Sequence, residues 1–272
     1  MAFERIFRVR CVFFSLLFTQ IFASYVANPV FIDSSSLQQS VPDLECSEVS
    51  SWLSSKISYE KEYMQDMNLQ FSSQGIKQRV QFAQFYGNFL SLTANIAKRV
   101  DLFAKGGVVN PFFQFANPIS GASQNNISTN RKSLPLWNLG AKFLLIKKNN
   151  WDVSLSGSYL QTEEKDFLFF QAVNPLSASH AEIKWYQWQV CSAIGYSTSF
   201  ISPYAGGKYS RTILSFDPDP NTLQVAKRKF DNRRRWGFFL GSTIVMSYYL
   251  EMNFEARLID EQSWTGAATL KF

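Results

Sequence analysis

Apolar and polar residues alternate along most of the chain from residue 51 onward. The clearest example is LEMNFEARL, residues 250–258, in which every second residue is apolar and the residues between them are polar or charged. A period of two indicates a β-strand, because successive side chains point to opposite faces. The same alternation in residues 90–96, 100–105, 137–145, 151–159 and 187–196 predicts an all-β protein.

The lengths of these segments favour a membrane-spanning sheet. Soluble strands run for about 5 or 6 residues, whereas strands that cross a membrane need about 9 to 11. Aromatic residues also gather at the segment ends, as expected where rings meet lipid headgroups: Trp137, Trp151, Tyr159, Trp188, Tyr248, Tyr249 and Trp264. We therefore predict a transmembrane antiparallel β-barrel of about ten strands, with eight to twelve as the range. The predicted strands are 51–64, 83–97, 100–115, 134–147, 151–163, 182–198, 201–216, 233–246, 249–259 and 262–272.

The predicted connections alternate in length. Short ones lie near Lys98, at 147–150, at 197–200 and near Ser247, and the long ones are 65–82, 116–133, 164–181 and 216–232. A tight turn at Asp260 and Glu261 follows. Outer-membrane barrels have short periplasmic turns and long outer loops, so both ends of the predicted barrel face the periplasm of a Gram-negative-type bacterium.

One segment tests a helical alternative. WGFFLGSTIVMSYYL, residues 236–250, is nearly uncharged, but it is short for a helical span and contains two glycines and two serines. A strand, a turn near Ser247 and a second strand fit it better.

The ends of the chain have distinct predicted roles. Residues 1–27 combine three arginines, an apolar stretch and small residues, which indicates a signal peptide cleaved after Ala23 or Ala27, although an uncleaved anchor helix is the alternative. Residues 28–50 are expected to be an irregular periplasmic segment and residues 51–272 the barrel. The last strand alternates up to Phe272, and an aromatic there resembles the signal read by the barrel-assembly machinery.

The alternation divides the predicted strand residues between lipid and lumen. Leu250, Met252, Phe254 and Leu258 are expected to face lipid. The polar residues opposite such apolar faces are expected to line the pore: Asp101, Lys105, Lys142, Asp152, Gln187, Gln189, Glu251, Asn253, Glu255 and Arg257.

Composition narrows the function classes. A mean hydropathy of -0.12 excludes a protein with many helical spans. Without residues 1–27 the formal net charge falls from +6 to 24 − 20, or +4, which is too modest to indicate nucleic acid as a partner. Cys46 and Cys191 follow the predicted signal peptide. The sequence allows three states for them: a disulfide between the two, links to other chains, or two free thiols.

Two further features suggest chemistry. His180, two residues before Glu182, could form a catalytic pair, but an exposed loop histidine is the simpler interpretation, since no nucleophile motif or metal-ligand set accompanies it. We therefore predict no enzymatic activity, no cofactor and no metal. KRKFDNRRR, residues 227–235, is either a solvated outer loop or a contact for lipopolysaccharide phosphates or sulfated glycans, through Lys227, Arg228, Lys229, Arg233, Arg234 and Arg235.

Several stretches resemble the chlamydial major outer membrane protein and its porin relatives. They include ISPYAGGKYSRTILSFD (201–217), GSTIV with EARLIDE (241–245 and 255–261), the closing TLKF, FLSLTANIAKRVDLFAKGG (89–107), IKWYQWQVCSAIGYS (183–197) and NPVFID (28–33). The resemblance implies a trimeric porin-like barrel of the outer membrane. This chain departs from the family in its shorter loops and its two mature cysteines.

The sequence thus predicts a porin-like barrel that passes small solutes through a narrow polar lumen. The alternative is a structural or adhesive surface barrel that does not conduct, and a barrel enzyme using His180 is the least favoured hypothesis. Outer-membrane lipid, lipopolysaccharide and further copies of the chain are the expected partners.

Overall fold

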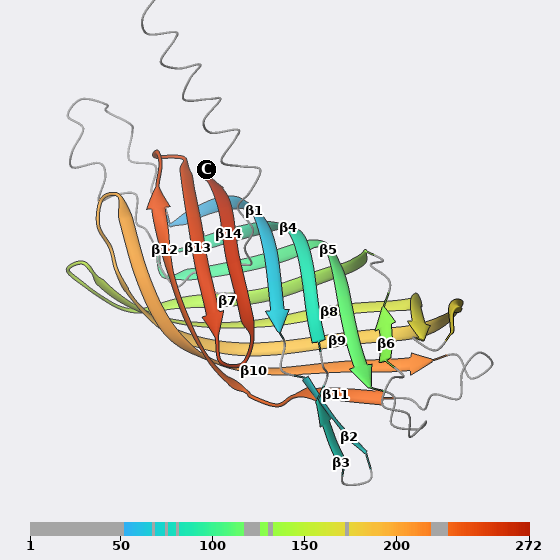
Figure 1. Cartoon of the computed structure of the whole chain (residues 1–272). Coiled ribbons are helices and arrows are strands. Elements are labelled where there is room, and N and C mark those ends of the chain that lie inside the picture. Colours follow the sequence, from blue (N-terminus) through green and yellow to red (C-terminus); the bar gives the residue numbers. More distant parts are fainter. Residues whose placement is uncertain are drawn as a thin grey trace, which may run out of the picture.

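Ten long strands of the chain close into an antiparallel β-barrel (Figure 1). The computed structural model describes residues 52–66, 69–73, 76–79, 82–116, 126–129, 133–171, 174–218 and 228–272. In chain order the barrel strands are β1 (Leu53–Asp66), β4 (Phe82–Ile96), β5 (Val100–Ala116), β7 (Leu134–Lys148), β8 (Trp151–Gln171), β9 (Asn174–Tyr196), β10 (Ile201–Pro218), β12 (Trp236–Val245), β13 (Leu250–Leu258) and β14 (Gln262–Lys271).

Each barrel strand pairs with its neighbour in the chain, and the last pairs with the first. β14 runs antiparallel to β1 from Lys56↔Lys271 to Asp66↔Gln262, with a bulge near Met64. The backbone N–H of Phe272 also donates to the carbonyl of Ser55 at 2.9 Å. This closure leaves no free edge among the ten strands, which is the condition for a sheet in hydrocarbon. The predicted fold class, an antiparallel barrel of about ten strands, is confirmed.

Four connections are short and lie at one end of the barrel, which we call the turn end. They occupy residues 97–99, 149–150, 197–200 and 246–249. Ala97, Lys98 and Asn149 adopt positive φ values of 52°, 54° and 54°, the conformation that tight hairpin turns require. The turn at 246–249 also confirms that residues 236–250 form strand, turn and strand. We call the opposite end the loop end.

The predicted long connections contain strands of their own. β2 (Leu69–Ser73) and β3 (Ile76–Arg79) form a hairpin that projects from the barrel in Figure 1, and β2 also pairs with β11 (Arg228–Asn232). β6 (Asn126–Thr129) pairs with β5 and β8.

The prediction that residues 164–181 form a long loop is wrong. β8 continues to Gln171 and β9 begins at Asn174, so the strands extend beyond the predicted boundary and only residues 172 and 173 lie between them. The pairing resumes past a bulge after Glu164, with Phe167 opposite Ala181. The stretch FLFF, residues 167–170, has the β-forming composition that sustains such an extension.

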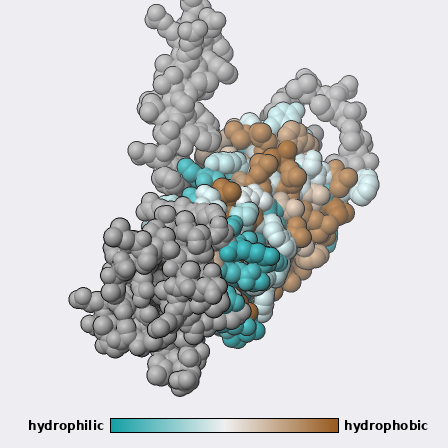
Figure 2. All heavy atoms as spheres, turned by 90° about the vertical axis from the view of Figure 1, so that its right-hand side faces the viewer, coloured by the Kyte–Doolittle hydropathy of each residue, from teal (hydrophilic) through white to brown (hydrophobic). Residues whose placement is uncertain are grey.

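The two faces of the barrel wall differ as the alternation requires. Apolar side chains dominate the outer face, which Figure 2 shows as a broad hydrophobic surface. Exposed aromatic residues on this face include Trp137, Trp188, Trp236 and Trp264, and the exposed Tyr249 lies in the adjoining turn. An apolar belt with aromatic residues on a closed barrel is the surface of a membrane-spanning protein. No helix among the described residues is long and apolar enough to cross a membrane.

Candidate functional site

The structure places all ten predicted pore-lining residues on the inner face of the wall. Each is buried, with at most 7% of its surface exposed. They come from β5, β7, β8, β9 and β13. The interior also contains two layers of side chains, one of ion pairs and one of apolar residues, that contact one another inside the barrel.

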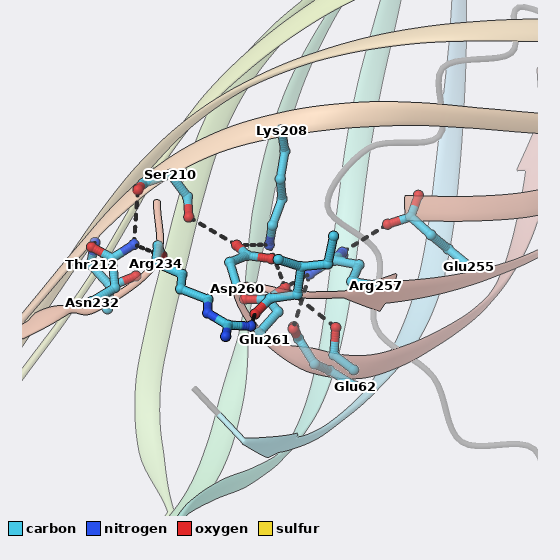
Figure 3. A network of polar contacts seen from close by, with 12 residues as sticks. Glu62, Lys208, Ser210, Thr212, Asn232, Arg234, Glu255, Arg257, Asp260 and Glu261 are labelled. Atoms are coloured by element: carbon cyan, nitrogen blue, oxygen red, sulfur yellow. Dashed lines mark hydrogen bonds and ion pairs between the residues drawn. The ribbon is translucent and has the colours of Figure 1, made fainter. Parts of the chain in front are cut away.

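The first layer is an ion-pair network (Figure 3). Arg257 on β13 is its centre: the guanidinium lies 2.8 Å from Glu255, 3.0 Å from Glu261 and 3.8 Å from Glu62 on β1. Lys208 on β10 lies 2.6 Å from Glu261 and 2.9 Å from Asp260. The same carboxylates therefore connect β10 to β13 and β1, and every charge in this layer has a partner.

The network continues toward β5. The ammonium of Lys105 lies 2.8 Å from Glu60 and 3.8 Å from Glu62, and 4.1 Å from the centre of the Phe89 ring. Ion pairs thus extend from β5 through β1 and β13 to β10. We call the eight residues Glu60, Glu62, Lys105, Lys208, Glu255, Arg257, Asp260 and Glu261 the ion-pair network.

The turn between β13 and β14 supplies two of its carboxylates. Asp260 and Glu261 point into the barrel, where Asp260 also accepts a hydrogen bond of 3.1 Å from the hydroxyl of Ser210. The preceding residue, Ile259, has a φ of 86°, which is strained for a β-branched side chain. Such strain persists where surrounding contacts over-determine a conformation, and here the ion pairs to Lys208 and Arg257 do so.

A glycine makes room for this turn. A Cβ atom at Gly237 on β12 would lie 2.0 Å from Oδ1 of Asp260 and 2.5 Å from its Cγ. Any larger residue would therefore move the Asp260 carboxylate away from Lys208.

The second layer is apolar and lies toward the loop end. Phe85 on β4 and Trp185 on β9 meet edge to face, with ring centroids 5.2 Å apart. Three strands separate β4 from β9 around one side of the barrel and five around the other, so this contact crosses the lumen. The surrounding buried residues form what we call the apolar inner cluster: Met64, Leu69, Phe85, Phe89, Val109, Phe113, Leu134, Leu136, Leu160, Ala181, Ile183, Trp185, Leu214, Phe216 and Phe230.

The charges buried in the described interior are predominantly acidic. The acidic set is Glu60, Glu62, Asp101, Asp152, Glu251, Glu255, Asp260 and Glu261, and the basic set is Lys105, Lys142, Lys208 and Arg257. Lys56 and Lys271 are half-buried on the same inner face, so eight carboxylates stand against six cations. This acidic excess attracts cations. No group of His, Cys, Asp and Glu in the described ranges is arranged to hold a metal ion.

The predicted lipid-facing residues lie on the outer face of β13. Leu258 is exposed and Leu250, Met252 and Phe254 are half-buried, while the charged residues between them are buried. Phe272, the predicted assembly signal, is 69% exposed beside β1.

Cys191 lies on the inner face of β9 as a buried free thiol, and Cys46 lies outside the described residues. His180 is part of β9, opposite Leu168, rather than in a loop as predicted. Its side chain is not among those described. Nearby, the half-buried Lys184 forms ion pairs with Glu182 at 3.1 Å and with Glu163 at 3.2 Å.

The six residues of the predicted polyanion contact do not form one group in the structure. Lys227 lies outside the described residues, and Arg228 belongs to β11, where it is opposite Phe216. Lys229, Arg233, Arg234 and Arg235 are exposed at the loop end. A hydrogen bond to the hydroxyl of Tyr209 and the nearby Asp231 carboxylate raise the pKa of Arg235.

Several interior residues were not among the sequence-predicted site residues. Glu60 and Glu62 stand at alternating positions in KISYEKEY, so the period-two rule could have identified them. Lys208 lies in GGKYS, where the alternation of β10 also places it inside. Asp260 and Glu261 gave no such signal, because a charged pair in a tight turn normally faces water.

Comparisons with known proteins give only distant structural similarity. No family model matches the chain, and no curated protein matches its sequence. The translocator domain of the autotransporter NalP from Neisseria meningitidis is similar over 90% of this chain and 99% of its own, with a TM-score of 0.46 and 9% identity. The outer membrane protein OprG from Pseudomonas aeruginosa is similar over 80% of this chain and 96% of its own, with a TM-score of 0.42 and 14% identity. The outer membrane protease OmpT from Escherichia coli is similar over 81% of this chain and 95% of its own, with a TM-score of 0.41 and 9% identity. The barrel assignment rests on the strand pairing of this chain itself.

Proposed function

We propose that the chain is an occluded β-barrel of a bacterial outer membrane, with a structural or adhesive role at the cell surface. The observation that carries this proposal is the contact between Phe85 and Trp185 across the lumen. Both side chains are at most 2% exposed, and apolar neighbours surround them. Water and ions would have to displace this layer to pass, at the cost of its buried apolar area.

The ion-pair network supports the same proposal from a second level of the barrel. Breaking it would leave buried charges without partners, which is strongly unfavourable. Ten strands also enclose a small lumen compared with the 16 to 18 strands of open porins. Three features support the proposed location in the outer membrane: the closed sheet, its apolar outer face, and the difference between its turn end and its loop end.

Porin-like conduction is the second candidate. The polar inner residues toward the turn end, among them Asp101, Lys142 and Asp152, favour it. If these residues belong to a path that opens when both layers rearrange, the acidic excess would make it cation-selective. The resemblance to the chlamydial porin family, and the trimer that it implies, also belong to this proposal.

Planar-bilayer recording separates the two candidates. Refolded protein that shows the heat-modifiable gel mobility of a closed barrel should produce no current steps. Reproducible steps from such protein would overturn the occluded-barrel proposal, and a cation preference in them would support the porin instead.

A further inference from the structure

Basic side chains gather at the loop end of β10 and β11. Arg211 faces outward on β10, Lys229 faces outward on β11, and Arg233, Arg234 and Arg235 follow in the connection to β12. We call these five residues the basic rim. Asp231 is the carboxylate paired with this group, 3.6 Å from Arg211 and 3.4 Å from Arg235. Within the described part of the chain, neither Arg233 nor Arg234 has an ion pair.

The basic rim lies directly next to aromatic residues of the membrane-facing surface. Trp188, Tyr209 and Trp236 are in contact, with ring centroids 5.4 Å apart in the first pair and 5.0 Å in the second. Trp236 is 71% exposed. Arg211 follows Tyr209 by two residues on the same face, which places it about 7 Å further along the strand. Arg235 immediately precedes Trp236 and donates a hydrogen bond of 3.5 Å to the hydroxyl of Tyr209.

The backbone beneath these arginines is fixed by a buried side chain. The amide group of Asn232 donates to the carbonyls of Ser210 and Arg234 at 2.9 and 2.8 Å, and its oxygen accepts from the N–H of Thr212 at 3.2 Å. The N–H of Ser210 also donates to the carbonyl of Arg235 at 2.8 Å. Arg233, Arg234 and Arg235 therefore belong to a connection with a fixed backbone, and the guanidinium of Arg234 itself donates a hydrogen bond of 3.5 Å to the carbonyl of Ile259. This pre-organisation lowers the entropic cost of binding a ligand.

We propose that the basic rim binds the phosphate groups of a lipid headgroup, lipid A of lipopolysaccharide being the outer-leaflet lipid of that chemistry. This inference rests on the proposed outer-membrane location. Aromatic rings mark the membrane interface, so cations one or two residues beyond them lie at the depth of headgroup phosphates. Guanidinium groups suit these phosphates because they donate two parallel hydrogen bonds to one phosphate. A soluble glycan would not require this position beside the aromatic rings.

The test compares binding of three probes to the full chain in detergent micelles: bisphosphorylated lipid A, dephosphorylated lipid A and heparin. The variant combines Arg233→Gln, Arg234→Gln and Arg235→Gln. The matched control combines Lys98→Gln, Arg99→Gln and Lys148→Gln, which removes three exposed charges at the turn end. Heat-modifiable mobility is measured for each protein, so that a failure of the barrel is seen separately from a failure to bind.

We expect the arginine variant to bind bisphosphorylated lipid A roughly 100-fold more weakly, at about fivefold for each of the three charges removed near a surface. The control should stay within about twofold, and loss of the lipid phosphates should weaken wild-type binding as much as the variant does. Equal binding by both variants, or binding indifferent to the phosphates, would overturn the inference. Heparin binding tighter than lipid A, with the same sensitivity to the variant, would overturn it in favour of a glycan site. None of these outcomes contradicts the occluded-barrel proposal if the variant retains the heat-modifiable gel mobility of the folded protein.

Discussion

Lys208 and Glu261 form an ion pair of 2.6 Å inside the barrel, although one lies on β10 and the other in the turn between β13 and β14. β12 and β13 stand between those positions in the wall, so the pair connects non-adjacent parts of the sheet. Arg257 shares the same carboxylate at 3.0 Å. The barrel interior is thereby held together by side chains as well as by the backbone ladder.

Removing the centre of the ion-pair network should be costly. In Arg257→Ala, Glu255 and Glu261 would remain buried without their guanidinium partner, and we expect a loss of about 3–5 kcal/mol in the free energy of unfolding. Denaturant unfolding in detergent micelles measures it. Arg233→Ala, at an exposed position, should stay within about 0.5 kcal/mol. Similar losses in the two variants would contradict the role of the network.

The turn at Asp260 should depend on Gly237. In Gly237→Ala the new methyl group would displace the Asp260 carboxylate from Lys208, at an expected cost of about 1–3 kcal/mol. Gly207 is the matched control, because the nearest atom to a Cβ there is 4.0 Å away. Gly207→Ala should change the unfolding free energy by less than about 0.5 kcal/mol. A tolerated Gly237→Ala would show that the turn can move without loss.

The apolar outer face should respond to charge according to depth. Phe254 lies in the middle of β13 and Leu258 at its end. Phe254→Arg should destabilise the inserted barrel by about 2–4 kcal/mol and Leu258→Arg by about 0–1 kcal/mol, because the penalty falls toward the interface. Folding into lipid vesicles at graded denaturant concentrations gives both values. Equal penalties would place β13 differently in the membrane.

Closure of the barrel should require Phe272, the aromatic residue that directly follows β14. We expect Phe272→Ser to lower the yield of heat-modifiable protein in the membrane fraction, because β14 must be recruited to β1 before its backbone groups are satisfied. Phe200→Ser is the control, since Phe200 is also exposed but lies in a turn away from the β1–β14 seam. Undiminished yield from Phe272→Ser would argue against an assembly signal.

The connection that presents Arg233, Arg234 and Arg235 should resist trypsin while Asn232 is intact. Asn232→Ala removes two buried hydrogen bonds and one part-buried hydrogen bond. Loss of buried partners costs about 1–3 kcal/mol, so we expect cleavage at these arginines to accelerate about tenfold. Mass spectrometry of timed digests identifies the cleaved sites. Asn150→Ala, at an exposed turn-end position, should leave the rate unchanged. An unaltered rate in Asn232→Ala would mean that Asn232 does not hold this segment.

The alternation of residues along the chain was enough to predict the strands and the two faces of the wall. Local alternation is sufficient for that, because a period of two assigns every residue of a long strand to one face. Glu251, Asn253, Glu255 and Arg257 were placed inside in this way. The end of β8 at Gln171 and the start of β9 at Asn174 could not be predicted in this way. The pairing of these strand ends depends on the neighbouring strand and not on a local signal.

The side chains that fill the interior could not be predicted without the closed barrel. Phe85 and Trp185 are 100 residues apart in the numbering and lie on opposite walls, so their contact follows from barrel closure and register. The sequence predicted a narrow polar lumen, whereas toward the loop end the inner face is apolar and packed. Asp260 and Glu261 likewise gain their partners only when β10 and β13 are brought together around them. Side-chain direction is a local property of a strand, but the partner that a side chain meets across a closed barrel is set by the whole sheet.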